Sequence, residues 1–352
     1  MKVLIAGQGL AGSVLALELI SRGVDVKVAD PLDVTSSTRV AAGVIRPITG
    51  RRIAKTYQAE ISVPAAFEFY SEAERLTGAR FIYRKDVLQL FQSASDANDW
   101  LGRMSEPGYD GFVGDFLKSS DFPAGYRHQT GGIFLTQCGY LDTGRFLDSI
   151  RDILIREKRF IKAKVTADAL QHESGRLIFQ DEKFDKVICC EGSYSLYGDF
   201  FPDIPFRLVK GEIIDFKADH LDERYIINFG KFILPVGNGS YRTGSTYSWH
   251  MLDDKPTAKV REMFEDFLKN TIEVPFEITG HLAGVRPAIV DRKPVAGFRP
   301  DKPELGIFNG LGSKGVMLGP LYARQLADLM IENKPVDPLI SSDRFLKDMD
   351  TQ

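Results

Sequence analysis

Several features that mark specialised proteins are scarce in this chain of 352 residues. It has three cysteines, Cys138, Cys189 and Cys190, whose spacing fits neither a metal site nor a disulfide framework, so we expect buried, inert thiols. No run of eighteen apolar residues occurs, and the apolar start at residues 1–6 is too short for a signal peptide, which favours a cytoplasmic protein without a membrane anchor. The 45 basic and 48 acidic residues are mixed along the chain, so the distribution of charge gives no indication of broad nucleic-acid binding.

What remains is the composition of an ordinary globular protein. Hydrophobic residues make up 43% of the chain, which is enough for a sizeable core. The length predicts two domains, or one domain with a second one inserted into it.

The clearest pattern lies in the first thirty residues. A short apolar run, Lys2–Ala6, leads into Gly7-Gln8-Gly9-Leu10-Ala11-Gly12, and a helical pattern then continues to Ser21. A second apolar run, residues 24–29, ends at Asp30. This segment predicts a dinucleotide-binding unit, because it has a strand, a glycine-rich turn, a helix, a second strand and an acidic residue in the required order.

Each part of this unit has a physical task. Gly7 permits the tight turn, Gly9 lets the backbone approach a pyrophosphate, and Gly12 lets helix and strand pack closely. The first helical amides, at Leu10 and Ala11, face the anion.

Asp30 follows the second strand, where its carboxylate can accept hydrogen bonds from ribose hydroxyls. An acid at this place disfavours a 2′-phosphate, so the sequence predicts FAD or NAD(H) rather than NADP(H).

A loop rich in small residues follows at residues 36–47 and contains Ala41-Ala42-Gly43. A dinucleotide unit followed by such a loop resembles the FAD-dependent D-amino acid oxidase superfamily, in which the loop lies along the isoalloxazine ring. The resemblance implies an α/β fold, with a Rossmann-type FAD-binding domain and an inserted, mostly antiparallel β-sheet substrate domain. Further cofactor contacts expected in this part of the chain are Pro31, Arg39, Ala42, Gly43 and Val44.

Periodicity predicts the remaining elements. Helices are expected at 53–78, 94–104, 143–156, 257–270 and 316–330. Strands are expected at 87–91, 161–165, 177–179, 184–190, 209–216, 225–229, 232–236, 241–245 and 305–309. Residues 106–126 are expected to form a surface loop, and 237–239 a hairpin turn. We assign 1–80, 140–200 and 285–352 to the FAD-binding domain, and 81–139 and 201–284 to the substrate domain.

The C-terminal part carries the second dense resemblance. Gly284-Val285-Arg286-Pro287 matches a passage of the superfamily, and Gly310 to Gly315 is similar to the FAD domain of the bacterial bifunctional tRNA methylaminomethyl-thiouridine enzymes. The resemblance implies that loop amides there face the flavin, and that Val165, Cys190 and Gly192 lie at the dinucleotide. The expected loop contacts are Gly312, Ser313, Lys314, Gly315 and Val316. Because no cysteine lies in this loop, we expect noncovalent FAD.

The resemblance also suggests substrate residues. Arg286 is the candidate for a substrate carboxylate, because a guanidinium offers two parallel charged hydrogen bonds. Phe232 stands where glycine oxidases carry a carboxylate-binding tyrosine, so Tyr241 or Tyr247 could substitute. Arg242 stands near the oxygen-activating lysine of sarcosine oxidases.

Other charged residues have weaker support. Arg46 and Lys210 are further candidates for the cavity, although each is more often a solvated charge. His250 and His281 titrate near neutral pH and could transfer protons, although isolated histidines are more often structural.

The sequence thus favours an FAD-dependent oxidoreductase that takes a hydride from the carbon next to an amine of a small amino acid or N-substituted glycine, giving an imine that hydrolyses. The electron acceptor is O2 or another compound. One alternative is a stand-alone tRNA-modifying oxidoreductase that removes a carboxymethyl group from a modified uridine, with tRNA as the only nucleic-acid partner. Others are a catalytically inactive flavin-binding interaction protein and, with less support, an NAD-dependent dehydrogenase.

Overall fold

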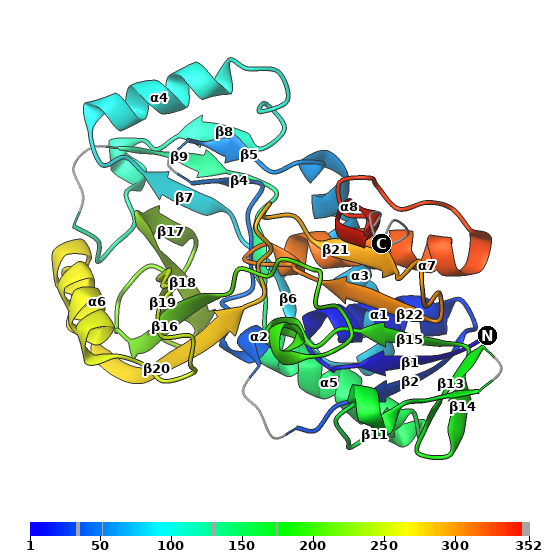
Figure 1. Ribbon diagram of the computed structural model, residues 1–352. Helices are drawn as coiled ribbons and strands as arrows, with labels where there is room; N and C mark the ends of the chain where they lie inside the picture. The colour runs from blue at the N-terminus through cyan, green and yellow to red at the C-terminus, as the bar shows by residue number, and fades with distance from the viewer. Residues whose placement is uncertain (33–35, 51, 128–130, 174, 347–352) are drawn as a thin grey trace.

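A parallel sheet built around the first strand forms one half of the molecule (Figure 1). The computed structural model describes residues 1–32, 36–50, 52–127, 131–173 and 175–346. Within these residues the sheet has six strands in the order β11-β2-β1-β15-β22-β21. Their bounds are β1 Lys2–Ala6, β2 Asp25–Ala29, β11 Phe160–Ile161, β15 Lys186–Cys189, β21 Val295–Phe298 and β22 Leu305–Asn309. Only β21 pairs antiparallel in this sheet.

Both faces of this sheet are buried, which explains why β1 reads as a continuous apolar run. Val3 and Ile5 pack into one core cluster, whereas Leu4 and Ala6 pack into another, because successive side chains of a strand point to opposite faces. The first cluster includes side chains of helices α1, α3, α5 and α7. These helices span α1 Leu10–Ser21, α3 Ala59–Thr77, α5 Thr143–Arg156 and α7 Gly315–Glu332. The second cluster lies under a small sheet of β12 Gln171–Glu173, β13 Arg176–Phe179 and β14 Glu182–Phe184.

A second, mostly antiparallel sheet forms the other half, on the left of Figure 1. Among the described residues it has eight strands in the order β20-β16-β19-β18-β17-β7-β9-β8. Their bounds are β7 Val87–Leu90, β8 Val113–Phe116, β9 Gly132–Leu135, β16 Val209–Lys217, β17 Ile226–Phe229, β18 Lys231–Gly237, β19 Ser240–Gly244 and β20 Glu277–Arg286. Helix α6, Ala258–Thr271, covers one face through a third core cluster. The expected mixed α/β class, with a mostly parallel sheet and a second, mostly antiparallel sheet, is therefore confirmed.

Short elements connect the two halves. The three-stranded sheet β3-β10-β6 ties the loop after β2 to the chain before α5. The remaining bounds are α2 Ser37–Val40, β3 Val44–Ile45, β4 Ile48–Thr49, β5 Ala54–Lys55, β6 Ile82–Arg84, α4 Ala94–Met104, β10 Gly139–Leu141 and α8 Asp343–Leu346. Single 3-10 turns lie at Ser119–Asp121, Ala167–Ala169 and Gly192–Tyr197.

Four expected elements differ from the structure. The expected strand 184–190 is divided between two strands, since Phe184 ends β14 and β15 spans Lys186–Cys189. The helix expected from residue 53 begins only at Ala59, because the preceding residues form the β4-β5 hairpin. The expected surface loop 106–126 contains β8, which extends the second sheet by pairing with β9. The expected strand 161–165 is limited to Phe160–Ile161, where pairing with β2 ends.

The strands of the second sheet begin within the ranges 81–139 and 201–284, and those of the first sheet begin outside them. The exact domain division stays a prediction, and its last residues, 347–352, lie outside the described chain. None of the helices in the described part combines the length and apolar character that a membrane span requires.

Candidate cofactor and substrate cavity

The glycine-rich turn after β1 has the geometry that a dinucleotide requires. Gly7 has φ +103°, a conformation that side-chain-bearing residues rarely adopt. A Cβ on Gly12 would lie 1.9 Å from the Gly7 carbonyl oxygen, so only glycine lets α1 start this close to the strand. The turn therefore brings the start of α1 to the cavity, where Gly9, Leu10 and Ala11 line the wall and the Leu10 amide donates a 3.2 Å hydrogen bond to the Thr38 hydroxyl.

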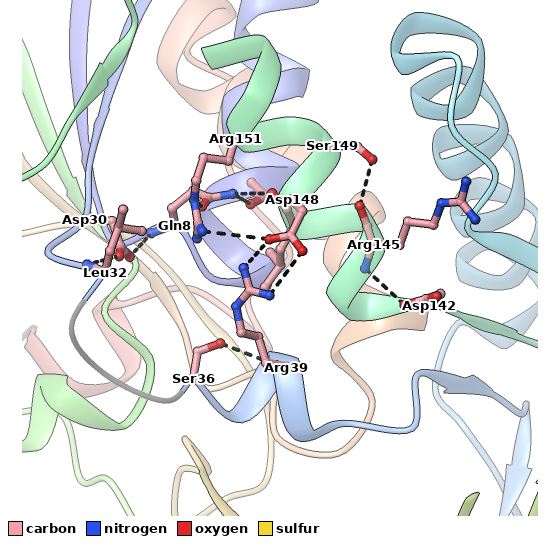
Figure 2. Close-up of polar contacts among 12 residues, drawn as sticks. Gln8, Asp30, Leu32, Ser36, Arg39, Asp142, Arg145, Asp148, Ser149 and Arg151 are labelled. Atoms are coloured by element: carbon pink, nitrogen blue, oxygen red, sulfur yellow. Dashed lines mark hydrogen bonds and ion pairs between the residues drawn. The ribbon is translucent and has the colours of Figure 1, made fainter. Parts of the chain in front are cut away.

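Asp30 is held beside this turn by backbone amides (Figure 2). Its Oδ2 accepts a hydrogen bond of 2.7 Å from the Gln8 amide, and its Oδ1 accepts one of 2.9 Å from the Leu32 amide. The carboxylate lines the cavity with lone pairs remaining, as the predicted ribose contact requires.

Gln8 is a supporting residue that sequence reasoning did not single out. It is 2% exposed, and its side chain donates to the Ser13 hydroxyl and the Leu147 carbonyl and accepts from Arg151 Nε at 2.8 Å. A buried amide with all of these partners anchors the turn to α5. Its place between two glycines of the motif is the signal that could have identified it.

Arg39 is not among the residues that line the cavity, although Thr38 and Val40 on either side of it are, and its cofactor contact stays a prediction. Its guanidinium forms an ion pair with Asp148 of α5, and Arg151 approaches the same carboxylate at 3.8 Å (Figure 2). An exposed carboxylate on the neighbouring helix competes for this side chain, and the sequence gives no sign of that partner.

The loop of small residues packs tightly against β10. Gly43 has φ +67°, and a Cβ there would lie 1.9 Å from the Leu141 carbonyl oxygen. The Gly43 carbonyl accepts a 3.0 Å hydrogen bond from the Leu141 amide. Ala42, Gly43 and Val44 consequently present a flat, narrow wall to the cavity.

The cavity lies where the carboxyl ends of β1 and β15 face the second sheet, and its volume is about 520 Å³. This is the edge at which open α/β sheets bind ligands. Predicted cofactor residues that line it are Gly7, Gly9, Leu10, Ala11, Asp30, Ala42, Gly43, Val44, Cys190, Gly192, Gly312, Ser313, Lys314, Gly315 and Val316. Pro31 and Val165 do not line it, and Val165 is buried in the second core cluster.

Hydrogen bonds from Asn309 and Gly312 hold the loop before α7 against two other segments. Asn309 donates hydrogen bonds to the Gly192 carbonyl at 3.0 Å and to the Ser195 hydroxyl at 2.8 Å. Gly312, with φ +57°, donates to the Pro287 carbonyl at 3.2 Å. Asn309 was not predicted, because its partners come from a segment more than a hundred residues away.

Arg286 lines the cavity, and neighbouring groups hold its guanidinium in a fixed orientation. Its Nη1 donates to the Thr246 carbonyl at 3.1 Å, and the guanidinium stacks 4.8 Å from the ring centre of Tyr247. A Cβ on Gly211 of the paired strand β16 would lie 2.0 Å from Arg286 Nη2. The missing side chain at Gly211 therefore makes room for the guanidinium.

Tyr241 lies outside the cavity lining, which corrects its assignment to the site. It is 1% exposed, stacks on Phe216 and donates to the Leu221 carbonyl at 2.5 Å. Burial raises the pKa of this phenol well above its usual value. The alternation of β19 turns this side chain into the core under α6.

Arg242 points to the opposite face and is also held outside the cavity. Its Nε donates to Asp215 at 2.7 Å, and its Nη1 donates to the Ala41 carbonyl at 3.2 Å. It supports the loop of small residues, whereas the sequence placed it among the catalytic candidates. Of the two candidate tyrosines, Tyr247 lines the cavity, as does Phe232.

The other ionisable candidates divide between cavity and core. Arg46 lines the cavity. Lys210 is 2% exposed, is paired with Asp253 and does not line the cavity. His281 lies 2.9 Å from Glu212, and burial lowers the pKa of its imidazole. His250 is exposed, and neither histidine lines the cavity.

The three cysteines are free and buried, as expected. Burial raises the pKa of Cys138 to about 12 and that of Cys190 still further, so both thiols stay protonated. No group of three His, Cys, Asp or Glu side chains that could hold a metal occurs in the described part of the chain.

Glu191 is a carboxyl group of the cavity that the sequence did not point to. It follows β15 and lines the wall near the glycine turn, where a Cβ on Gly7 would lie 3.3 Å from Glu191 Cα. Burial raises the pKa of its carboxyl to about 7, with partial opposition from Lys164. Below that pH the group is neutral and compatible with a nearby pyrophosphate.

This pKa predicts that stability falls with rising pH. In the unfolded chain the carboxyl titrates near 4.5, so the ligand-free folded state binds more protons than the unfolded chain between pH 4.5 and 7 and loses stability across this window. From pH 5 to pH 8, wild type should lose on the order of 2 kcal/mol more unfolding free energy than Glu191→Gln. Urea unfolding at both pH values measures the difference. Equal losses in the two proteins would refute a buried, protonated Glu191.

The fold and the cavity define a dinucleotide-binding α/β protein whose site is roofed by a second sheet. The sequence profile of the family described as FAD dependent oxidoreductase matches residues 2–329. The chain therefore belongs to that family, an oxidoreductase family whose cofactor is FAD. The glycine turn, Asp30 and the narrow loop fit this cofactor.

Individual relatives support the same family. A glycine oxidase from Pseudomonas aeruginosa is 30% identical over 161 residues, which is 44% of each chain. A tRNA 5-methylaminomethyl-2-thiouridine biosynthesis bifunctional protein from Marinobacter nauticus is 24% identical over 93% of this chain and 55% of its own length. The matches thus span about half the length of these relatives. The structure of glycine oxidase from Bacillus cereus shares the fold, with a TM-score of 0.78, 19% identity and 95% of both chains covered.

Proposed function

We propose that this protein takes a hydride from the carbon next to the amine of a small amino acid or N-substituted glycine. FAD accepts the two electrons of the C–H bond in this chemistry, and the resulting imine reacts with water to give a carbonyl compound and an amine. The observation that carries the proposal is the Arg286 guanidinium, which Tyr247 and the Thr246 carbonyl hold at the cavity.

The chain's own residues bind and orient in this scheme. Arg286 binds the substrate carboxylate, and the ring of Tyr247 keeps the guanidinium in place. The turn at Gly7 and Gly9 holds the pyrophosphate, and Asp30 holds the ribose. The amides of the loop at residues 312–316 face the flavin without a covalent link.

An anaerobic titration tests the proposal. Purified protein is followed by flavin absorbance while sarcosine, glycine, proline and a panel of D-amino acids are added, and oxygen is then admitted. Bleaching by an amine with fast reoxidation identifies an oxidase, and slow reoxidation identifies a dehydrogenase with another acceptor. Bound FAD that no amine bleaches contradicts the proposal.

A second candidate is the removal of a carboxymethyl group from a modified uridine in tRNA. The match to the bifunctional tRNA protein over 93% of this chain supports it. Two aromatic side chains that line the cavity, Tyr194 and Tyr247, are also 40% and 56% exposed, so a base could stack at its opening. Flavin bleaching by undermodified tRNA, but by no free amine, would favour this candidate.

An inactive flavin-binding protein is the least supported alternative. Such a protein would be expected to have a sealed or apolar space beside the flavin. The lining instead carries Arg46, Lys231, Arg286 and Lys314.

A further inference from the structure

Four cationic side chains line the cavity without an acidic partner. They are Arg46, Lys231, Arg286 and Lys314. Across the ranges that the structure describes, no carboxylate lies within ion-pair distance of any of them, although most other buried or half-buried cations have one. Unpaired cations in a partly buried site are costly, and such a site favours an anionic ligand.

Two of these cations, Arg286 and Arg46, lie near Tyr247, and a third, Lys314, lies near Arg46. Tyr247 stacks on Arg286 and also interacts electrostatically with Arg46. Lys314 lies close enough to Arg46 for the two charges to repel, and its Nζ donates to the Thr56 hydroxyl at 2.9 Å. Burial lowers the pKa of both Arg46 and Lys314. We call Arg46, Tyr247, Arg286 and Lys314 the anion end of the cavity.

The two carboxylates of the cavity do not neutralise this end. Asp30 already accepts the amides of Gln8 and Leu32, and Glu191 lies next to the glycine turn at the dinucleotide edge. With the pyrophosphate at the glycine turn, as proposed above, one substrate carboxylate on Arg286 would leave Arg46 and Lys314 without a counter-charge at their own end of the cavity.

We propose that the substrate carries two anionic groups, as in an amine with two carboxylates, one bound by Arg286 and the other by Arg46 with Lys314. The inference rests on the proposed function in one respect: the amine between the two anionic groups is the one that the proposed reaction oxidises. The binding of two anions is testable without any turnover.

The binding test uses two matched ligands that carry sulfur in place of the amine. Thiodiacetate has two carboxylates, and (methylthio)acetate has one. Each is titrated into oxidised, FAD-loaded protein at constant ionic strength, with calorimetry and flavin absorbance as readouts. Two extra charge-assisted hydrogen bonds predict at least about 10-fold tighter binding of thiodiacetate. Equal dissociation constants for the two ligands would overturn the inference.

Variants of Arg46 and Lys314 test whether these two residues bind the second carboxylate of the ligand. Arg46→Met and Lys314→Met, each compared at equal flavin content, should reduce the preference for thiodiacetate over (methylthio)acetate to less than about 3-fold. Lys217→Met is the control, since Lys217 is an exposed lysine on β16 outside the cavity lining, and it should keep the full preference. An unchanged preference in both cavity variants would contradict the assignment.

Two amine substrates distinguish the proposal of a dianionic substrate from the proposal of amine oxidation. Iminodiacetate and N-ethylglycine are similar in size but differ by one carboxylate. Bleaching by N-ethylglycine as efficient as by iminodiacetate refutes the dianionic substrate and leaves amine oxidation intact. Tight thiodiacetate binding without bleaching by any amine refutes amine oxidation and leaves the dianion site intact.

Discussion

Gly211→Ala is expected to reduce kcat/KM for the carboxylate-bearing amine roughly 10- to 100-fold while the protein stays folded and retains FAD. The added Cβ would lie 2.0 Å from Arg286 Nη2, so the guanidinium, at the end of a flexible side chain, would have to shift away from the Thr246 carbonyl and the Tyr247 ring. This shift would remove the paired hydrogen bonds that we propose between the guanidinium and the substrate carboxylate. Anaerobic bleaching kinetics and the dissociation constant of (methylthio)acetate measure the loss.

Gly280→Ala on the paired strand β20 is the matched control. A Cβ there has the Asp215 side chain as its nearest neighbour, at 3.3 Å, away from the cavity. It should bind (methylthio)acetate as wild type does. If Gly211→Ala also retains wild-type ligand affinity, Arg286 is not the carboxylate-binding residue.

Gly12→Ala is expected to abolish FAD binding and to lower the free energy of unfolding by about 3 kcal/mol or more. The new Cβ would lie 1.9 Å from the Gly7 carbonyl oxygen, a backbone atom that cannot move without opening the turn. The amides at the start of α1 would then no longer point at the pyrophosphate. Flavin content after purification and urea unfolding of the flavin-free chain measure the two effects.

Gly102→Ala provides the comparison within a helix. Gly102 lies in α4, and a Cβ there would have no heavy atom within 4 Å. Alanine has the higher helix propensity, so this variant should be about 0.5–1 kcal/mol more stable and should keep its flavin. Similar behaviour of the two variants would show that the close approach at Gly12 does not determine cofactor binding.

The dinucleotide unit was predictable because its signal is local. The strand, the turn at Gly7, helix α1 and Asp30 lie within thirty consecutive residues, and each depends on contacts to neighbours in sequence. Helix α4 likewise begins with the Ser93 cap and ends at Met104, as the periodicity predicts.

The side-chain contacts that the sequence did not predict have partners that are distant in sequence. Tyr241 and Arg242 are adjacent on β19 and point to opposite faces, and the partner of each lies at least twenty residues away. Arg39 pairs with Asp148, which is 109 residues further along the chain. A single sequence does not reveal which acid reaches which guanidinium.

The sequence by itself determined the dinucleotide-binding unit and the order of its strands and helix along the chain, because turn geometry and periodicity act over short distances. Its resemblance to a known family added FAD and the passage that contains Arg286. Only the tertiary structure decided which charges share the cavity. Arg46, Lys231, Arg286 and Lys314 come from four segments, and folding brings them to one space with no acidic partner among the described residues. Long-range packing thus sets the charge that a substrate has to match.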